Sequence, residues 1–318
     1  MVNPTNGGDD LVAPYASELQ LVFSEAKRRI TDFPEPFAQA GLAYLQKFDV
    51  FERASSKNYI CYLLPYWINE VAPIPISQCR ELAIANVFNM LYYFLQDDVM
   101  DESPAAWKEQ LALAHLCHAE LEAILRGLFT AESSFWHHGQ QYVQEWASAV
   151  VHEDKHDFFK TDFIKVAKKA SPLKLASTGV LLLADRQELI AQVDQLVDLA
   201  LVLLQMADDL ADWEEDLQEG NYNCLIAIIH DKRHSTLPLQ AHEIESYIYD
   251  RGLLIDFCAR GKTILDTLNH SQFHVRPIFS FGVSIYDGLA SFSEKVEHTK
   301  RTILLGGFDY ILSNNQKN

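Results

Sequence analysis

Apolar side chains recur at helical spacing along most of this chain, and this pattern restricts its fold more than any other feature. Strand-like alternation is scarce, and residue pairs typical of β-hairpin turns are nearly absent. Glycine and proline lie mostly between the periodic segments, and no linker-like stretch divides them. We therefore expect an all-α fold, a single-domain helical bundle of about ten helices over residues 15–312. The predicted helical segments are residues 40–51, 78–97, 107–128, 135–151, 157–169, 189–217, 242–268 and 278–305.

The two ends of the chain differ in composition from the rest. Residues 1–14 are rich in Gly, Asn, Asp and Pro, which predicts a disordered lead-in, and residues 313–318 predict a flexible tail. We find no signal-peptide pattern and no run of about 18 apolar residues, so no stable membrane insertion is expected. The five cysteines include no CxxC pair, which favours buried thiols in a reducing, cytoplasmic compartment.

The net charge narrows the classes of partner. The chain has 26 basic and 44 acidic residues, so its net charge is 26 − 44 = −18. Binding to nucleic acid or to an anionic membrane requires a basic surface, and both are therefore disfavoured. A surplus of carboxylates is compatible with cation binding, although it is also common on ordinary solvated surfaces.

An apolar run, LYYFLQ at 91–96, leads directly into a first acidic cluster. Asp97 and Asp101 are four residues apart and share one face of the expected helix, whereas Asp98 and Glu102 lie off that face. Like charges at this spacing, near the negative end of the helix dipole, destabilise a helix. A bound Mg²⁺ would reverse both effects. Apolar side chains occupy the same stripe before the acids, and we expect them to line a cavity: Met90, Tyr93 and Phe94.

A second apolar run ends in the same way, in DDLADWEED at 208–216. Asp208, Asp212 and Asp216 are spaced four and four, which places them in one stripe over two helical turns. Two long apolar helices with acidic ends predict one joint site that binds several Mg²⁺ ions and, through them, a polyanionic substrate. The alternative is two helix ends that simply extend into solvent.

Together, DDVMDE at 97–102 and DDLADWEED at 208–216 resemble the aspartate-rich motifs of the class I isoprenoid synthases. The resemblance implies a helical bundle with a central apolar cavity, three Mg²⁺ ions (or Mn²⁺) and a linear prenyl diphosphate as substrate. It implies catalytic roles for Asp97, Asp101, Asp208 and Asp212. The implied metal ligands are Asp97, Asp98, Asp101, Asp208, Asp212 and Asp216.

The second motif does not distinguish the branches of that family. It fits the (N/D)Dxx(S/T/D)xxxE of terpene cyclases, except that Asp216 stands where Glu is usual and Glu215 offers an alternative ligand. It also fits the DDxxD of trans-prenyl diphosphate synthases, and DWEEDLQEG is similar to squalene and phytoene synthases. The oligomeric state, monomer or homodimer, is equally open.

Other segments favour a cyclase that acts on farnesyl or geranylgeranyl diphosphate. Prenyl synthases usually carry two arginines after the first motif, where this chain has Ser103-Pro104-Ala105-Ala106. The Gly-Lys-x-x-Arg segment that binds their second diphosphate is also missing from the sequence.

A diphosphate also needs basic partners. Lys168 and Lys169 lie about 40 residues before the second motif, where both branches place a basic residue. Arg301, beside Lys300, lies near the position of a C-terminal Arg-Tyr pair in many microbial cyclases, and Arg276 is a weaker candidate. These residues are predicted substrate-binding groups, with a solvated surface role as the alternative.

Two competing interpretations remain. Residues 152–156 read HEDKH, which matches the HExxH of zinc proteases, with His152 and His156 as ligands and Glu153 as base. Its middle positions are charged, which is atypical of that class. The other alternative is not an enzyme: a helical binding protein with degenerate acidic motifs.

Overall fold

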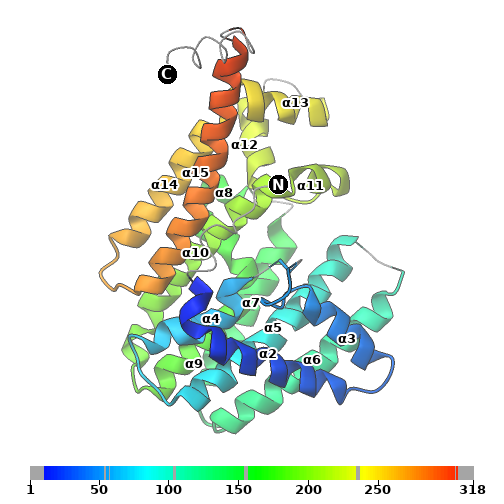
Figure 1. Ribbon diagram of the computed structural model, residues 1–318, viewed down its shortest axis with the longest axis vertical. Helices are drawn as coiled ribbons and strands as arrows, with labels where there is room; N and C mark the ends of the chain where they lie inside the picture. Colours follow the sequence, from blue (N-terminus) through cyan, green and yellow to red (C-terminus); the bar gives the residue numbers. More distant parts are fainter. Residues whose placement is uncertain are drawn as a thin grey trace, which may run out of the picture.

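The computed structural model describes residues 11–53, 55–56, 58–102, 105–153, 157–233, 237–304 and 306. Helices account for 81% of the structure, and the described residues contain no strand, which confirms the predicted all-α class (Figure 1). The described elements include 14 α-helices rather than about ten. Two expected helices, 189–217 and 242–268, are each divided into two α-helices. Four further α-helices lie outside the predicted segments, at residues 16–31, 59–69, 175–183 and 224–232.

The described elements follow one another along the chain. Those labelled η are 3₁₀-helices, except η6, which is a π-helix. In chain order they are η2 (Ala13–Tyr15), α2 (Ala16–Thr31), α3 (Phe37–Gln46), α4 (Tyr59–Asn69), α5 (Ile76–Glu102), α6 (Trp107–Leu128), α7 (Phe135–His152), α8 (Phe158–Thr161), η4 (Phe163–Lys174), α9 (Leu175–Leu183), η5 (Gln187–Leu189), α10 (Ile190–Ala211), α11 (Trp213–Glu219), α12 (Cys224–Lys232), α13 (Ala241–Glu245), η6 (Ser246–Asp250), α14 (Leu253–Asn269) and α15 (Arg276–Leu304).

Three expected helices differ from the structure for local reasons. The segment 157–169 is not one α-helix. Only α8 is α-helical, and the rest belongs mainly to η4, a 3₁₀-helix that continues to Lys174. The segment 189–217 is interrupted at Asp212, whose backbone leaves the helical region between α10 and α11. The segment 242–268 is interrupted at Gly252, whose φ of 74° suits a residue without a Cβ.

The N-terminal expectation also needs correction. Helical structure begins within the predicted lead-in, at Leu11, and Leu11 and Val12 pack against the core because both are apolar. The rest of that prediction, residues 1–10, and the predicted tail at 313–318 lie outside the described residues.

Two long helices position the acidic clusters. α5 packs against α2, α4, α6 and α9, while α10 packs against α12, α14 and α15. The segment η4 contacts both α5 and α10 and therefore connects the two halves of the core. In this arrangement the acidic ends of α5 and α10 border the same region as η4.

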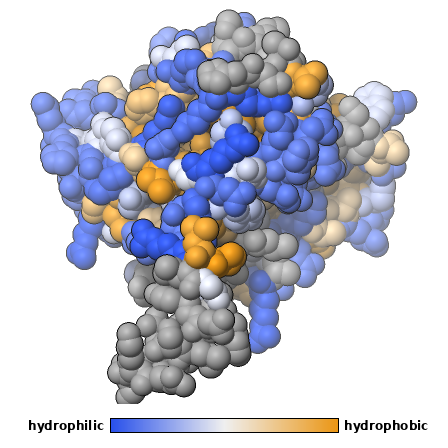
Figure 2. All heavy atoms as spheres, turned by 90° about the horizontal axis from the view of Figure 1, so that it is seen from above, coloured by the Kyte–Doolittle hydropathy of each residue, from blue (hydrophilic) through white to orange (hydrophobic). Residues whose placement is uncertain are grey.

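Among the described residues, one helical stretch is both long and apolar: Gln187–Ala211, which comprises η5 and α10. By length and composition it would be able to span a membrane, a property that we did not expect from the sequence. However, 67% of its most apolar window is buried inside the protein, so these side chains belong to the core. The face shown in Figure 2 is mainly hydrophilic, with separate apolar patches.

All five cysteines are free and buried, as predicted. Burial raises the pKa of the Cys61, Cys79 and Cys117 thiols to about 12. These groups therefore stay protonated at neutral pH and are poor nucleophiles.

Close packing of α9 on α5 gives a first prediction. A Cβ at Gly179 would lie 2.7 Å from Leu82 Cδ2 and 3.4 Å from the tip of Phe129, and both side chains are buried. Gly179→Ala should therefore destabilise the protein by about 1–3 kcal/mol, measured by urea unfolding. The matched control is Gly127→Ala in α6, where a Cβ meets nothing within 4 Å and should be neutral or stabilising. Equal stability of the two variants would contradict this account of the packing.

Candidate functional site

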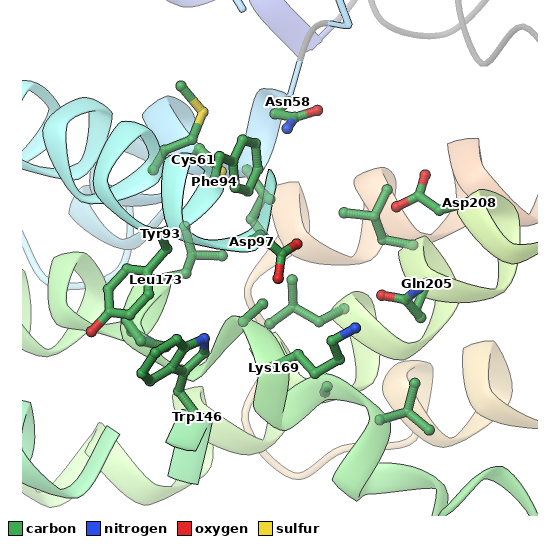
Figure 3. Close-up of a pocket in the computed structure, with 18 of the residues that line it drawn as sticks. Asn58, Cys61, Tyr93, Phe94, Asp97, Trp146, Lys169, Leu173, Gln205 and Asp208 are labelled. Atoms are coloured by element: carbon green, nitrogen blue, oxygen red, sulfur yellow. The ribbon is translucent and has the colours of Figure 1, made fainter. Parts of the chain in front are cut away.

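A cavity of about 460 Å³ lies where α5, α10 and η4 meet. Its volume is in the range of sites that hold small organic ligands. Figure 3 shows Asp97 and Asp208 on different helices beside the same space, with Lys169 and Gln205 between them. The cavity is therefore bordered by residues far apart in the sequence.

Both acidic clusters contribute to this one cavity. Residues of the first cluster come from the C-terminal end of α5, and those of the second come from α10, α11 and the break between them. The lining aspartates are Asp97, Asp98, Asp101, Asp208, Asp209, Asp212 and Asp216. The phenol of Tyr44 donates a hydrogen bond to Asp98 Oδ2 at 2.9 Å, so one oxygen of this carboxylate already has a partner.

The break at Asp212 gives the second cluster its shape. Asp209 accepts hydrogen bonds from the backbone N–H of Cys224 and from Gln205 Nε2, both at 2.7 Å, so it anchors the start of α12. Asn223 caps α12 and also donates to Asp216 Oδ2 at 2.7 Å. Asp216 lines the cavity, whereas Glu215 is exposed and is not among the described lining residues. Of the two alternatives for the last acidic position, the structure therefore places Asp216 at the site.

The carboxylates at this site are hard to ionise without a cation. Burial, followed by the neighbouring Asp209 and Asp212, raises the pKa of Asp208 to about 7. The side chain of Asp208 is exposed to solvent within the cavity, whose walls still reduce its hydration. Burial also raises the pKa of Asp216 to about 6, and raises the pKa values of Asp97 and Asp212. Raised carboxyl pKa values are common at functional sites, and a bound cation would favour the ionised form of these groups.

These raised pKa values predict how the stability of the metal-free protein depends on pH. Unfolded aspartate has a pKa of about 3.9, so the folded state binds more protons than the unfolded state between about pH 4 and 7. Stability should therefore fall as the pH rises through this window. We expect a higher melting temperature at about pH 5.5 than at pH 7.5, and a smaller difference in Asp208→Asn. An unchanged difference in Asp208→Asn would contradict the role of that carboxyl.

Lys169 is the basic residue that the structure places at the cavity. Its Nζ lies 2.5 Å from Glu153 Oε2, and both residues line the cavity. Burial lowers the pKa of Lys169, but Glu153 and Asp97 oppose this effect and the net shift is upward. Lys169 is therefore a stable ammonium next to the acidic rim.

The other predicted basic residues lie elsewhere. Lys168, adjacent in sequence, turns away from the cavity and pairs with Asp198 Oδ2 at 2.6 Å. Arg301 is exposed in the last turn of α15, a 29-residue helix whose C-terminal part lies near α12 and α13 in Figure 1. Arg276 is exposed at the other end of α15. The structure brings none of these three to the described lining of the cavity.

Besides the carboxylates, apolar and aromatic side chains make up much of the cavity lining. Met90, Tyr93 and Phe94 all line it, in the positions expected from the stripe on α5. Sequence reasoning did not identify Trp146, whose ring meets Tyr93 edge-on with 5.0 Å between centroids. It also did not identify Phe48, which meets Phe94 at 5.2 Å. Neither residue belongs to a motif, so only the fold reveals them.

The HExxH interpretation finds no support in the described residues. α7 ends at His152, whose Nδ1 lies 2.7 Å from the carbonyl oxygen of Ser148. Glu153 pairs with Lys169 at the cavity rather than standing as a free base. The second histidine of the motif, His156, lies outside the described residues.

The composition of the cavity suits a divalent cation, although its present geometry is more open. Among the described residues no three carboxylate, histidine or cysteine side chains converge as they would around a bound ion. Eight carboxylates nevertheless line the cavity, against one ammonium among the described lining residues. Carboxylate oxygens are the ligands that Mg²⁺ prefers, and bound cations would reduce the repulsion between the carboxylates. The donor set therefore fits Mg²⁺ bound by residues of both clusters.

Known proteins give no independent indication of the activity. No protein family, no characterised protein and no solved structure matches the chain. The functional interpretation therefore depends on the residues of the site.

Proposed function

We propose that this protein is a Mg²⁺-dependent class I terpene cyclase that ionises a linear prenyl diphosphate and cyclises the resulting carbocation. The observation that carries the proposal is the meeting of both aspartate-rich segments at one cavity with an apolar interior. A ligand that suits this cavity has an anionic head and a long apolar body, and prenyl diphosphates have this form. We further propose a cytoplasmic location and farnesyl or geranylgeranyl diphosphate as the substrate.

The charge balance supports both the cofactor and the substrate. A diphosphate would be repelled by the acidic rim unless cations came with it. Asp97, Asp101, Asp208, Asp212 and Asp216 would hold the ions, with Asp98 beside them and already hydrogen-bonded to Tyr44. Bound Mg²⁺ supplies the charge that draws electrons from the breaking C–O bond.

The residues of the chain have separate roles in the proposed reaction. Lys169 donates hydrogen bonds to the diphosphate and stabilises it as the leaving group. When the allylic C–O bond breaks, its electron pair stays on the diphosphate and the carbon chain becomes cationic. The faces of Tyr93, Phe94 and Trp146 attract that positive charge, and the apolar wall excludes water until a ring has closed. The cyclic cation then loses a proton to the released diphosphate, which gives a hydrocarbon, or takes up a water molecule that passes a proton to the diphosphate, which gives an alcohol.

A condensing enzyme, of the prenyl diphosphate or squalene and phytoene synthase type, is the alternative within the same chemistry. Such an enzyme binds two diphosphates. Lys169 is the one cationic side chain among the described residues that line the cavity, which favours a single diphosphate. Outside this chemistry, a helical binding protein with degenerate acidic motifs would bind no diphosphate in a Mg²⁺-dependent way.

The test is an analysis of products. The purified protein is incubated with Mg²⁺ and C10, C15 or C20 prenyl diphosphates, with and without isopentenyl diphosphate, and the products are identified by gas chromatography with mass spectrometry. We expect a cyclic hydrocarbon or alcohol from one substrate alone. Longer diphosphates that form only with isopentenyl diphosphate would assign the protein to the prenyl synthases instead.

A further inference from the structure

The segment η4 is an unusually long 3₁₀-helix. It runs for 12 residues, from Phe163 to Lys174, whereas 3₁₀ runs longer than three or four residues are uncommon. The winding matters because a 3₁₀-helix has three residues per turn, so residues three apart line up along one side. The sequence of η4 therefore divides into three straight rows.

The three rows have different surroundings. Val166, Lys169 and Pro172 form one row, and all of them line the cavity. The second row also lines the cavity: Ala167, Ala170 and Leu173. The third row turns away from it and meets α7 and α10: Lys168, Ser171 and Lys174.

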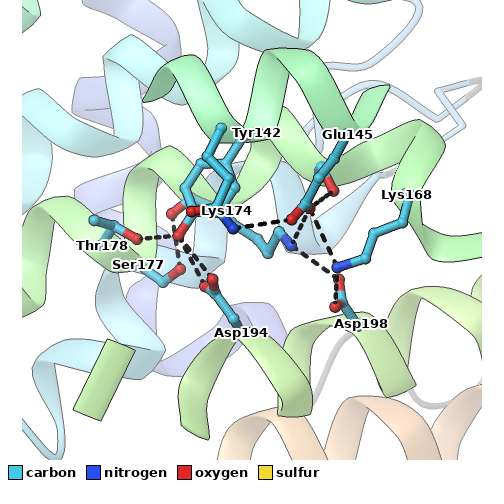
Figure 4. A network of polar contacts seen from close by, with 10 residues as sticks. Tyr142, Glu145, Lys168, Lys174, Ser177, Thr178, Asp194 and Asp198 are labelled. Atoms are coloured by element: carbon cyan, nitrogen blue, oxygen red, sulfur yellow. Dashed lines mark hydrogen bonds and ion pairs between the residues drawn. The ribbon is translucent and has the colours of Figure 1, made fainter. Parts of the chain in front are cut away.

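One carboxylate meets these three residues of the third row, whose first member, Lys165, is exposed and lies beside Asp162 instead. Glu145 Oε2, on α7, accepts a hydrogen bond from Ser171 Oγ at 2.6 Å and one from Lys174 Nζ at 3.0 Å. Lys168 Nζ lies 3.2 Å from the same oxygen. Asp198, on α10, completes the cluster by accepting from Lys168 and Lys174 (Figure 4).

These contacts depend on the 3₁₀ winding. In an α-helix, with 3.6 residues per turn, positions six apart such as Lys168 and Lys174 would point roughly 120° apart. One carboxylate would then be unable to meet both ammonium groups and the hydroxyl between them. The cluster is also well protected, since Ser171 is 0% exposed, Lys174 1% and Asp198 4%. Despite the opposing effect of burial, Ser171 and Lys174 hold the pKa of Glu145 at about 2, so it stays ionised.

We propose that Glu145 is a positioning residue: by binding the row Lys168–Ser171–Lys174 it holds η4 in the 3₁₀ form, which directs Lys169 toward the acidic rim. This inference adds to the proposed function a residue that controls the position of Lys169. It rests on the proposed function only for the identity of the ligand. If η4 rewound as an α-helix, the rows would twist about its axis. Lys169 would then leave Glu153 and the cavity.

The first experiment measures the position of Lys169 without any ligand. The protein is treated with a limiting acetylating reagent, and modification of Lys169 relative to Lys165 is followed by mass spectrometry. Lys165 lies in the same segment, is exposed, and is not among the described lining residues, so it serves as an internal reference. In Glu145→Gln, Lys169 should react at least about tenfold faster than in the wild type, because a charged hydrogen-bond acceptor has been lost.

A matched control separates positioning from general loosening. Glu120→Gln, on α6, removes the charge from another half-buried ion pair, with Arg29 at 3.0 Å. It should leave the reactivity of Lys169 unchanged. If Glu145→Gln does not fold, Ser171→Ala removes one contact of the same row without disturbing a charge and should act in the same direction. Unchanged reactivity in the folded variants, or an equal rise in Glu120→Gln, would overturn the proposal.

The second experiment uses inorganic pyrophosphate with Mg²⁺, titrated by calorimetry. Glu145→Gln should weaken binding about tenfold in the wild-type background. It should have little effect when Lys169 and its partner Glu153 are both already glutamine, because Glu145 and Lys169 act on the ligand as one unit. Additive losses would show that Glu145 acts independently of Lys169 and would overturn the inference. If the wild type binds no pyrophosphate, the proposed function fails, while the acetylation result still decides the role of Glu145.

Discussion

Asp97→Asn is expected to reduce Mg²⁺-dependent release of diphosphate by at least about a hundredfold, the largest effect that we predict for a single substitution. The carboxylate lies at the rim formed by α5 and borders the same cavity as Asp208. Asparagine keeps the size of the side chain but is a much weaker ligand for Mg²⁺. The measurement is the steady-state rate with farnesyl diphosphate at saturating Mg²⁺.

Stability separates this effect from damage to the fold. Burial raises the pKa of Asp97, Lys169 opposes this effect, Asp101 and Asp98 add to it, and the net shift is upward. The ionised form is therefore unfavourable in the metal-free protein, and Asp97→Asn should melt at the same temperature or higher. Glu214→Gln, an exposed change in the second acidic segment, should keep full activity. Full activity in Asp97→Asn would refute the role of this residue as a metal ligand.

Removal of the positive charge at Lys169 should give the second largest effect. Replacing Lys169 alone would leave Glu153 without its partner in a mainly buried position, which is often strongly destabilising. The sharper variant is therefore the pair Lys169→Gln and Glu153→Gln, which removes both charges together. We expect the apparent affinity for the prenyl diphosphate to fall at least about tenfold, since a charge-assisted hydrogen bond is lost.

The control for this variant lies in the same segment. Lys165→Gln removes one positive charge from η4 at an exposed position that is not among the described lining residues. It changes the net charge of the protein by one unit but should not alter the affinity. If both variants weakened binding equally, the effect would be a general one of charge, and Lys169 would not be a direct partner of the diphosphate.

The sequence predicted the features that depend on local periodicity. The stripe of Met90, Tyr93 and Phe94 before Asp97 was recognisable because a regular helix places residues three and four apart on one face. α5 is such a helix, and these side chains line the cavity as expected. The spacing of the two acidic clusters likewise led to the expectation of a joint site.

The features that sequence reasoning did not predict depend on tertiary structure. The segment 157–169 has ordinary helical periodicity, but η4 continues to Lys174 and contains Pro172, which disfavours an α-helix. The contacts of Glu145 and Asp198 with η4 come from distant parts of the chain and are not visible in the sequence. The adjacent residues Lys168 and Lys169 have different surroundings, because neighbouring residues of a helix point in different directions and η4 lies between the cavity and α10. Trp146 and Glu153 reach the cavity from α7 and its end, a helix that carries no acidic motif of its own.

One measurement tests the central claim most directly. It is the rate at which the wild-type protein releases diphosphate from farnesyl or geranylgeranyl diphosphate, first with Mg²⁺ and then after a chelator has removed the Mg²⁺. The account predicts release with Mg²⁺, none above the uncatalysed rate after chelation, and recovery when Mg²⁺ is restored. A protein that folds correctly, contains Mg²⁺ and releases no diphosphate from either substrate would contradict it.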